Sequence, residues 1–200
     1  MKNEHWFWIG GWGIPPRWFQ TEIEKVIPDA EHTFVPPTAD AFSEFDPTHF
    51  SRIGGYSLGA FLLLQNAEKI PQPALLLAPF FAYPLEESLG GKINRTQIRY
   101  LRRWLRRAPL EALSDFYKRA KLALPEPTKL PYALEDLEWG LTQLADKSVP
   151  PRMPKNWRGI VGRDDPLLDA VQIIELEPRI QITPTAGHHP TELLSAVQSQ

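Results

Sequence analysis

The segment Gly55-Tyr56-Ser57-Leu58-Gly59 joins two apolar runs that favour different secondary structures. The run from Phe50 to Gly54 predicts a short strand, and the run from Leu58 to Ala67 predicts a buried helix of good helix formers. A glycine on each side of the serine allows a sharp turn from strand to helix, which strains the serine backbone and exposes its hydroxyl. An ordinary helix N-cap serine is the alternative. We interpret Ser57 as a nucleophile.

Two segments in the C-terminal third place an acid and a base after predicted strands. They are Gly162-Arg-Asp-Asp165-Pro and Gly187-His188-His189-Pro190. In such an array the imidazole takes the serine proton during attack on a carbonyl, and the carboxylate orients the imidazole. Asp164 is a rival for the role of Asp165, and His189 is a rival for that of His188. The order serine, acid, base along the chain differs from the orders of the chymotrypsin and subtilisin types.

The fourth motif lies near the start of the chain. His5-Trp-Phe-Trp-Ile9 predicts a buried strand, and Gly10-Gly11-Trp12-Gly13 then turns towards a helix that begins around Pro15-Pro16. Acyl transfer needs N–H donors aimed at the developing oxyanion, one after the nucleophile and one in the loop after an early strand. We expect these donors to be the Leu58 and Trp12 amides, although a plain tight turn would also explain the glycines.

Together these motifs resemble the α/β hydrolases and, within them, the pimeloyl-acyl-carrier-protein methyl ester esterases of biotin synthesis. That family shows Gly-Trp-Gly, Gly-x-Ser-x-Gly, Gly-x-x-Asp and Gly-His-x-Pro, which here are residues 11–13, 55–59, 162–165 and 187–190. The resemblance implies a serine esterase with the triad Ser57, Asp165 and His188. It also implies that the Trp12 and Leu58 amides bind the oxyanion. A glycine stands where many members have a histidine before the Gly-Trp pair.

The resemblance further implies that the substrate is the methyl ester of a pimeloyl chain on acyl carrier protein. The same motifs occur in lipases, thioesterases and other esterases, so a generic carboxylesterase or an acyl thioesterase is the alternative. A catalytically silent hydrolase fold that serves as a binding module is a further alternative of a different class.

Apolar strand-like runs alternate with helical runs, which predicts an α/β fold with a mostly parallel sheet and helices on both faces. We expect about six strands, at residues 6–9, 31–35, 50–54, 73–77, 157–161 and 179–183, and a last helix from Thr191 to Val197. We expect a minimal α/β-hydrolase fold in which the two leading strands common in larger hydrolases are missing. Residues 80–150 break the rhythm with helical runs and no convincing strand. We expect a catalytic domain of residues 1–79 and 151–200 with a helical cap inserted at 80–150.

The cap carries a concentration of positive charge. Residues 94–121 contain nine Lys or Arg against two acidic residues, a charge of +7, so the rest of the chain carries −9 to give the net −2. A solvated helix face would explain such a run, and so would a nucleic-acid partner, which the acidic pI of about 6.2 disfavours. The resemblance implies an acidic carrier docked on a basic cap. The expected carrier-binding residues are Arg95, Arg99, Arg102, Arg103, Arg106 and Arg107.

Helical spacing places Arg95, Arg99, Arg102 and Arg106 on one side of the predicted helix. Two or three of the aromatic residues in and beside the cap are expected to line an acyl channel. The set comprises Phe80, Phe81, Tyr83, Trp104, Phe116, Tyr117 and Trp139.

Composition limits the remaining functions. The 200 residues, 42% of them hydrophobic, suffice for one sizeable core. Cysteine is absent and the five histidines show no metal-ligand spacing, so we expect no metal and no cofactor. Neither a signal peptide nor an apolar run of membrane-spanning length is seen, so we expect a cytoplasmic monomer with no membrane or nucleic-acid partner.

Overall fold

The computed structural model describes residues 4–43 and 45–198 and contains a six-stranded parallel sheet. The strands, in order across the sheet, are β2 (Glu31–Val35), β1 (His5–Ile9), β3 (Arg52–Tyr56), β4 (Ala74–Leu77), β7 (Arg158–Gly162) and β8 (Ile180–Thr183). All five pairings are parallel. The six predicted strands and the fold class are therefore confirmed, with strand ends shifted by at most two residues.

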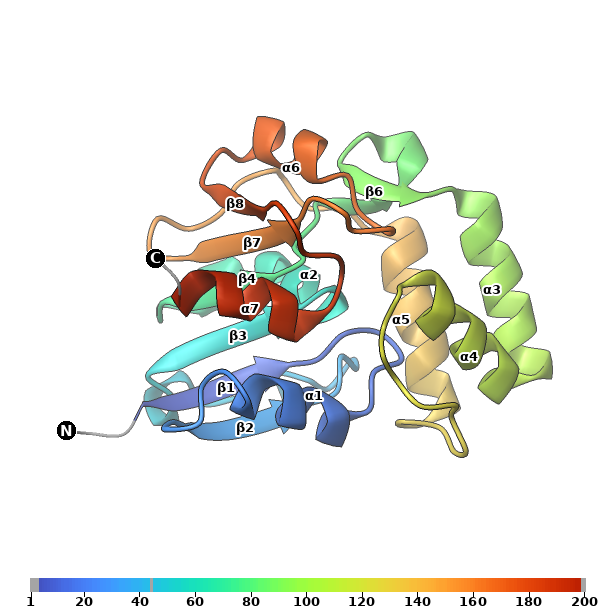
Figure 1. Cartoon of the computed structure of the whole chain (residues 1–200), viewed down its shortest axis with the longest axis horizontal. Helices are drawn as coiled ribbons and strands as arrows, with labels where there is room; N and C mark the ends of the chain where they lie inside the picture. Colours follow the sequence, from blue (N-terminus) through green and yellow to red (C-terminus); the bar gives the residue numbers. More distant parts are fainter. Residues whose placement is uncertain (1–3, 44, 199–200) are drawn as a thin grey trace.

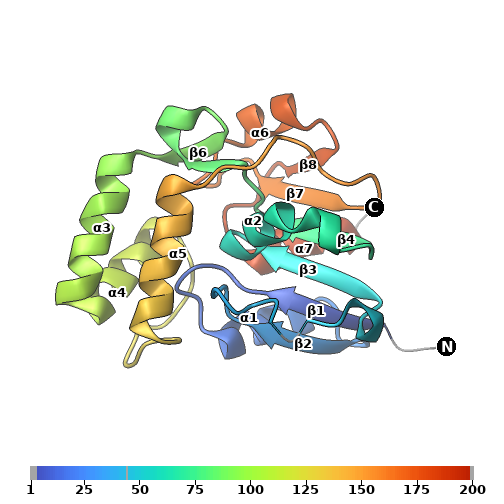
Figure 2. The same ribbon diagram turned by 180° about the vertical axis from the view of Figure 1, so that it is seen from behind.

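Helices cover both faces of this sheet, as Figures 1 and 2 show. On one face α1 (Pro16–Glu24) packs beside α7 (Pro190–Gln198), and on the other α2 (Leu58–Gln65) packs on β3. The short α6 (Ala170–Leu176) lies next to the edge strand β8. The central strands are apolar on both faces because both faces are covered: all four residues of β4 are buried, and so are Trp8 and Ile9 in β1.

The inserted region holds three helices at the carboxyl ends of the sheet strands (Figure 1). They are α3 (Arg95–Arg107), α4 (Pro109–Arg119) and α5 (Leu134–Asp146). These helices pack on one another, and we call them the cap. None of the helices in the described part of the chain is long and apolar enough to span a membrane.

The expectation of no strand between residues 80 and 150 is wrong. A small parallel sheet forms there from β5 (Ala82–Pro84) and β6 (Gly90–Ile93). A single bridge from Ala82 to Ser148 joins the two ends of this region, and a single bridge from Gly91 to Leu168 attaches the small sheet to the segment that follows β7 (Arg158–Gly162). Three short 3-10 helices complete the elements of the described residues, at Pro47–His49, Ala67–Lys69 and Leu85–Glu87.

Candidate active site

Ser57 occupies the turn between β3 and α2. Its backbone has φ 53° and ψ −114°, a conformation that residues other than glycine rarely adopt. The turn is held because the Ser57 N–H donates to Leu77 O at 2.8 Å and Ser57 O accepts from Phe61 N at 3.0 Å. The side chain makes no N-cap hydrogen bond, which removes the N-cap interpretation. The Ser57 hydroxyl instead lies 3.1 Å from His188 Nε2.

His188 and Asp165 complete a buried hydrogen-bonded chain. His188 Nδ1 lies 2.6 Å from Asp165 Oδ2, and the two residues are 2% and 1% exposed. The other carboxylate oxygen of Asp165 accepts from the backbone N–H groups of Leu167 and Leu168 at 2.8 and 3.1 Å. Because a carboxylate only accepts, Nδ1 is the donor and Nε2 is left to accept the Ser57 proton.

The rival acid and base point elsewhere. Asp164 is exposed. His189 packs edge-on against Trp18, and its Nε2 lies 4.0 Å from a Glu22 carboxylate oxygen. Burial lowers the pKa of His189 below its usual value. The structure thus brings Ser57, His188 and Asp165 together and leaves both rivals outside the array.

Two residues that support the array were not predicted. The Tyr56 hydroxyl donates to His188 O at 2.9 Å, and the Lys92 ammonium donates to Asp165 O at 2.8 Å. Tyr56 is fully buried and precedes Ser57 in the same motif. Its place in that motif could have indicated a contact with the segment that carries His188. Nothing in the sequence indicated that Lys92 contacts the loop after β7 that carries Asp165, which we call the acid loop.

Trp12 and Leu58 lie next to one another where β1 and α2 meet. A Cβ at Gly59 would lie only 2.1 Å from Ile9 O, so this glycine lets the start of α2 approach the end of β1. Within residues 4–43 and 45–198, neither the Trp12 N–H nor the Leu58 N–H has a hydrogen-bond partner. The two amides predicted to bind an oxyanion are therefore both available at this junction.

Comparison with solved structures identifies the architecture. An esterase from Exiguobacterium antarcticum has a TM-score of 0.68 at 11% identity, over 93% of this chain and 85% of that chain. BioG from Haemophilus influenzae has a TM-score of 0.53 at 15% identity, over 98% and 92%, and a hydrolase from Pseudomonas aeruginosa has 0.69 at 13%, over 98% and 85%. The chain has the α/β-hydrolase fold. No family model and no curated protein matches it by sequence.

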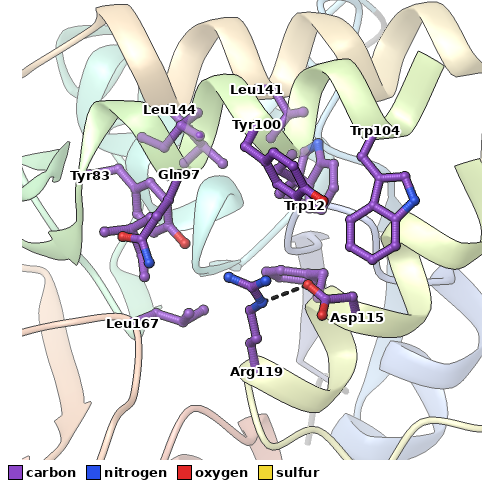
Figure 3. A pocket seen from close by; sticks show the side chains of 14 residues that line it. Trp12, Tyr83, Gln97, Tyr100, Trp104, Asp115, Arg119, Leu141, Leu144 and Leu167 are labelled. Atoms are coloured by element: carbon purple, nitrogen blue, oxygen red, sulfur yellow. Dashed lines mark ion pairs between the residues drawn. The ribbon is translucent and has the colours of Figure 1, made fainter. Parts of the chain in front are cut away.

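A pocket lies between the cap and the α/β-hydrolase core, with Trp12 in its wall (Figure 3). Its lining is mostly apolar and comes from both parts, with Leu167 from the acid loop and Leu141 and Leu144 from α5. An ion pair between Asp115 and Arg119, at 2.6 Å, forms a polar section of the wall. Among the seven aromatic residues considered for an acyl channel, those that line the pocket are Tyr83, Trp104 and Phe116.

The arginines of α3 fall into two groups. Arg95 pairs with Glu87, and Arg106 makes two hydrogen bonds to Glu138 at 2.8 and 2.7 Å. Arg102 shares that face, and its Nε is buried without a partner in the part of the chain that the structure describes. The side of α3 predicted to carry four arginines is therefore turned partly towards acidic residues of the same chain.

The second group consists of Arg99, Arg103 and Arg107. Their spacing of four residues aligns them along one side of α3, and all three are exposed. Arg103 and Arg107 make no ion pair with any described residue. Tyr100 and Trp104, both pocket residues, lie beside this stripe on the same helix. In the described residues no cluster of three metal-ligating side chains occurs.

Proposed function

We propose that the protein is a serine carboxylesterase in which Ser57 is the nucleophile, His188 the general base and Asp165 the group that orients the base. The observation that carries the proposal is the hydrogen-bonded chain from Ser57 through His188 to Asp165, at 3.1 and 2.6 Å, built on a strained turn. Nucleophile, base and orienting acid within hydrogen-bond reach are what acyl transfer by serine requires.

In the acylation step Ser57 Oγ attacks the ester carbonyl carbon while His188 Nε2 takes the hydroxyl proton. The carbonyl oxygen becomes an oxyanion, and the Trp12 and Leu58 amides donate hydrogen bonds to it. When the C–O bond to the alcohol breaks, the proton on His188 passes to the leaving alkoxide and the acyl group stays on Ser57.

Deacylation repeats these steps with water as the nucleophile. His188 takes a proton from water, the resulting hydroxide attacks the acyl-serine carbonyl, and the same two amides stabilise the second oxyanion. Collapse of this intermediate returns the proton to Ser57 Oγ and releases the carboxylic acid. The net reaction is hydrolysis of an ester to an acid and an alcohol, without any cofactor.

Labelling with a fluorophosphonate probe tests this proposal. The wild-type protein should be labelled at Ser57, and Ser57→Ala should be neither labelled nor active on p-nitrophenyl butyrate while retaining its thermal midpoint. Folded wild-type protein that resists the probe would contradict the enzyme proposal and would favour the silent binding module.

The substrate we propose is a pimeloyl methyl ester carried on acyl carrier protein. The motif resemblance points to this substrate, and the mostly apolar pocket beside Trp12 is suited to an alkyl chain. The exposed stripe Arg99, Arg103 and Arg107 would attract an acidic carrier to the side of α3 that bears the pocket residues Tyr100 and Trp104.

Products distinguish this substrate from its alternatives. Purified protein offered methyl pimeloyl-carrier should release methanol and leave pimeloyl-carrier intact. Release of the acyl chain from the carrier would identify a thioesterase instead. Equal efficiency on carrier-linked and short nitrophenyl esters would favour a generic carboxylesterase.

Charge reversal tests the docking surface separately. Arg103→Glu with Arg107→Glu should raise KM for the carrier-linked ester roughly tenfold at low salt, with less effect at high salt. The same pair should leave hydrolysis of a short nitrophenyl ester unchanged within about twofold. The matched control, Lys155→Glu with Arg158→Glu, makes the same change in charge at exposed positions near the amino end of β7. Equal loss in both double variants would refute specific docking on α3.

A further inference from the structure

The loop that follows β1 is held by the cap through both backbone groups of Gly13. The Gly13 N–H donates to the Tyr132 hydroxyl at 2.6 Å. The Gly13 carbonyl accepts from the Tyr117 hydroxyl at 2.7 Å. Tyr117 lies on α4 and Tyr132 just before α5, so the two hydroxyls come from different parts of the cap. The peptide planes on both sides of Gly13 are therefore fixed by cap side chains.

A third hydrogen bond and close packing hold the neighbouring residue. The indole N–H of Trp12 donates to Leu137 O on α5 at 2.8 Å, and the indole ring meets Phe116 of α4 edge-on at 4.8 Å. Trp12 is 2% exposed. Its side chain and the peptide that follows it thus both depend on the cap.

These contacts support the residue that carries the Trp12 N–H. This N–H belongs to the peptide that precedes Trp12, and it has no partner within the described residues. The carbonyl of the same peptide, Gly11 O, accepts from Ile14 N at 3.3 Å within the loop, while the cap holds the Trp12 side chain and the peptide that follows it. An oxyanion donor is effective only when it is fixed before the charge develops, because reorientation during the reaction costs free energy.

Both tyrosines keep their protons in this environment. Burial raises the pKa of Tyr117 to about 12, and it raises the pKa of Tyr132 further. The Tyr117 hydroxyl therefore remains a donor to Gly13 O over the whole range in which a serine esterase operates.

We propose that Tyr117 and Tyr132 are positioning residues for the oxyanion-binding amide of Trp12, so that the oxyanion site is complete only while the cap is docked. This inference rests on the proposed esterase function and adds two residues to it. Neither tyrosine touches the reacting atoms; both act through Gly13. The cap is thereby assigned a role in the rate of the chemical step as well as in the binding of substrate.

The test uses Tyr117→Phe, Tyr132→Phe and the double variant, each of which keeps the ring and removes the hydroxyl. We measure kcat and KM on p-nitrophenyl butyrate and the Ki of an aliphatic trifluoromethyl ketone, which forms an oxyanion with a nucleophilic serine. Amide hydrogen exchange of residues 10–14 gives a readout that needs no activity. Ser114→Ala is the control. Ser114 lies on α4, as Tyr117 does, and the substitution removes a hydroxyl that donates a hydrogen bond to Glu126 and does not contact the loop.

The double variant should lose about 10–100-fold in kcat with KM changed less than about twofold, because loss of a whole donor costs about 10²–10³. Ki for the ketone should rise by the same factor, and exchange at residues 10–14 should accelerate. Ser114→Ala should match the wild type. A double variant with wild-type kcat, or one whose kcat falls while Ki stays constant, would overturn the inference. A wild-type protein without esterase activity would instead overturn the proposed function. Unchanged hydrogen exchange at residues 10–14 in the double variant would then also show that Tyr117 and Tyr132 do not hold the loop.

Discussion

Gly140 on α5 offers a sharp test of whether the cap sets the geometry of the proposed oxyanion site. A Cβ at this position would lie 2.6 Å from Trp12 Cδ1 and 3.1 Å from Leu58 Cδ2. Both residues that supply the proposed donors therefore contact the same point on the cap helix. Ordinary contact begins at 3.4 Å, so Gly140→Ala requires a separation of at least 0.8 Å between α5 and Trp12.

The expected effects on stability and on activity differ in size. Alanine in place of a helical glycine gains about 0.8–1 kcal/mol of helix propensity, whereas overpacking of a buried site costs about 1–3 kcal/mol. The free energy of unfolding should fall by no more than about 2 kcal/mol. A catalytic group displaced by about 1 Å can lose about 10²-fold in rate, so kcat should fall roughly 10–100-fold.

The assay pairs urea unfolding with kcat and KM on p-nitrophenyl butyrate. Thr142→Ala, two residues further along α5, is the matched control because the Thr142 hydroxyl, within the described part of the chain, bonds to Glu138 O of its own helix and to no other residue. Gly140→Ala that is folded and retains kcat within twofold of the wild type would refute the reasoning that α5 positions Trp12 and Leu58. An equal loss in Thr142→Ala would refute it as well.

Three other substitutions test the supporting contacts. Asp165→Asn should lower kcat about 10³–10⁴-fold with little change in thermal midpoint, because an amide favours the wrong imidazole tautomer; a loss below tenfold would contradict the assignment. Tyr56→Phe removes the donor to His188 O and should lower kcat by about 3–10-fold and stability by about 1–2 kcal/mol, measured by kinetics and urea unfolding. The Arg179 guanidinium holds the pKa of the Glu177 carboxyl below its ordinary 4.5. Because the folded pKa is the lower one, this pairing stabilises the fold fully above pH 4.5 and is lost as pH falls below it. Glu177→Gln should therefore cost about 1.5–3 kcal/mol at pH 7 and progressively less in acid, and a difference from wild type that is independent of pH would disprove this.

The sheet was predictable because its strands lie inside the fold. Because the central strands are covered on both faces, they must be nearly continuous apolar runs. Such runs are visible in the sequence at His5 to Ile9 and at Ala74 to Leu77. The end of a strand is less well encoded. β3 was expected at 50–54 and lies at Arg52–Tyr56, because its pairing with β1, from Trp6 opposite Arg52 to Ile9 opposite Gly55, sets its position.

The two strands of the insertion were missed for the opposite reason. Ala82-Tyr-Pro84 and Gly90-Gly-Lys-Ile93 are short, contain proline or paired glycines and show no alternation of apolar residues. Their existence depends on pairing with one another and on single bridges to Ser148 and Leu168. Local composition disfavours a strand in both segments, and tertiary contacts override it.

The arginines of α3 show a similar division between local and distant information. Helical spacing predicted Arg95, Arg99, Arg102 and Arg106 on one side of the helix. It could not show that Glu87 and Glu138 lie opposite that face, since these residues belong to other elements. These acidic partners decide which arginines remain without an ion pair among the described residues. Arg103 and Arg107 are two of them, and the sequence included both in the predicted set without distinguishing them from the others.

The same limit explains why the sequence indicated the three residues of the Ser57 array but not the residues that position the loop beside it. Each member of the array lies in its own short motif, because the turn it occupies needs glycine or proline nearby. Tyr117 and Tyr132 need only a hydroxyl at the right place, 104 and 119 residues from Gly13, and no local pattern marks them. If Tyr117 and Tyr132 hold the loop as proposed, the cap cannot be exchanged for that of another protein with the α/β-hydrolase fold to change substrate choice alone. A foreign cap without the two hydroxyls would leave the Trp12 amide unsupported, so kcat would fall even for substrates that the new cap binds well.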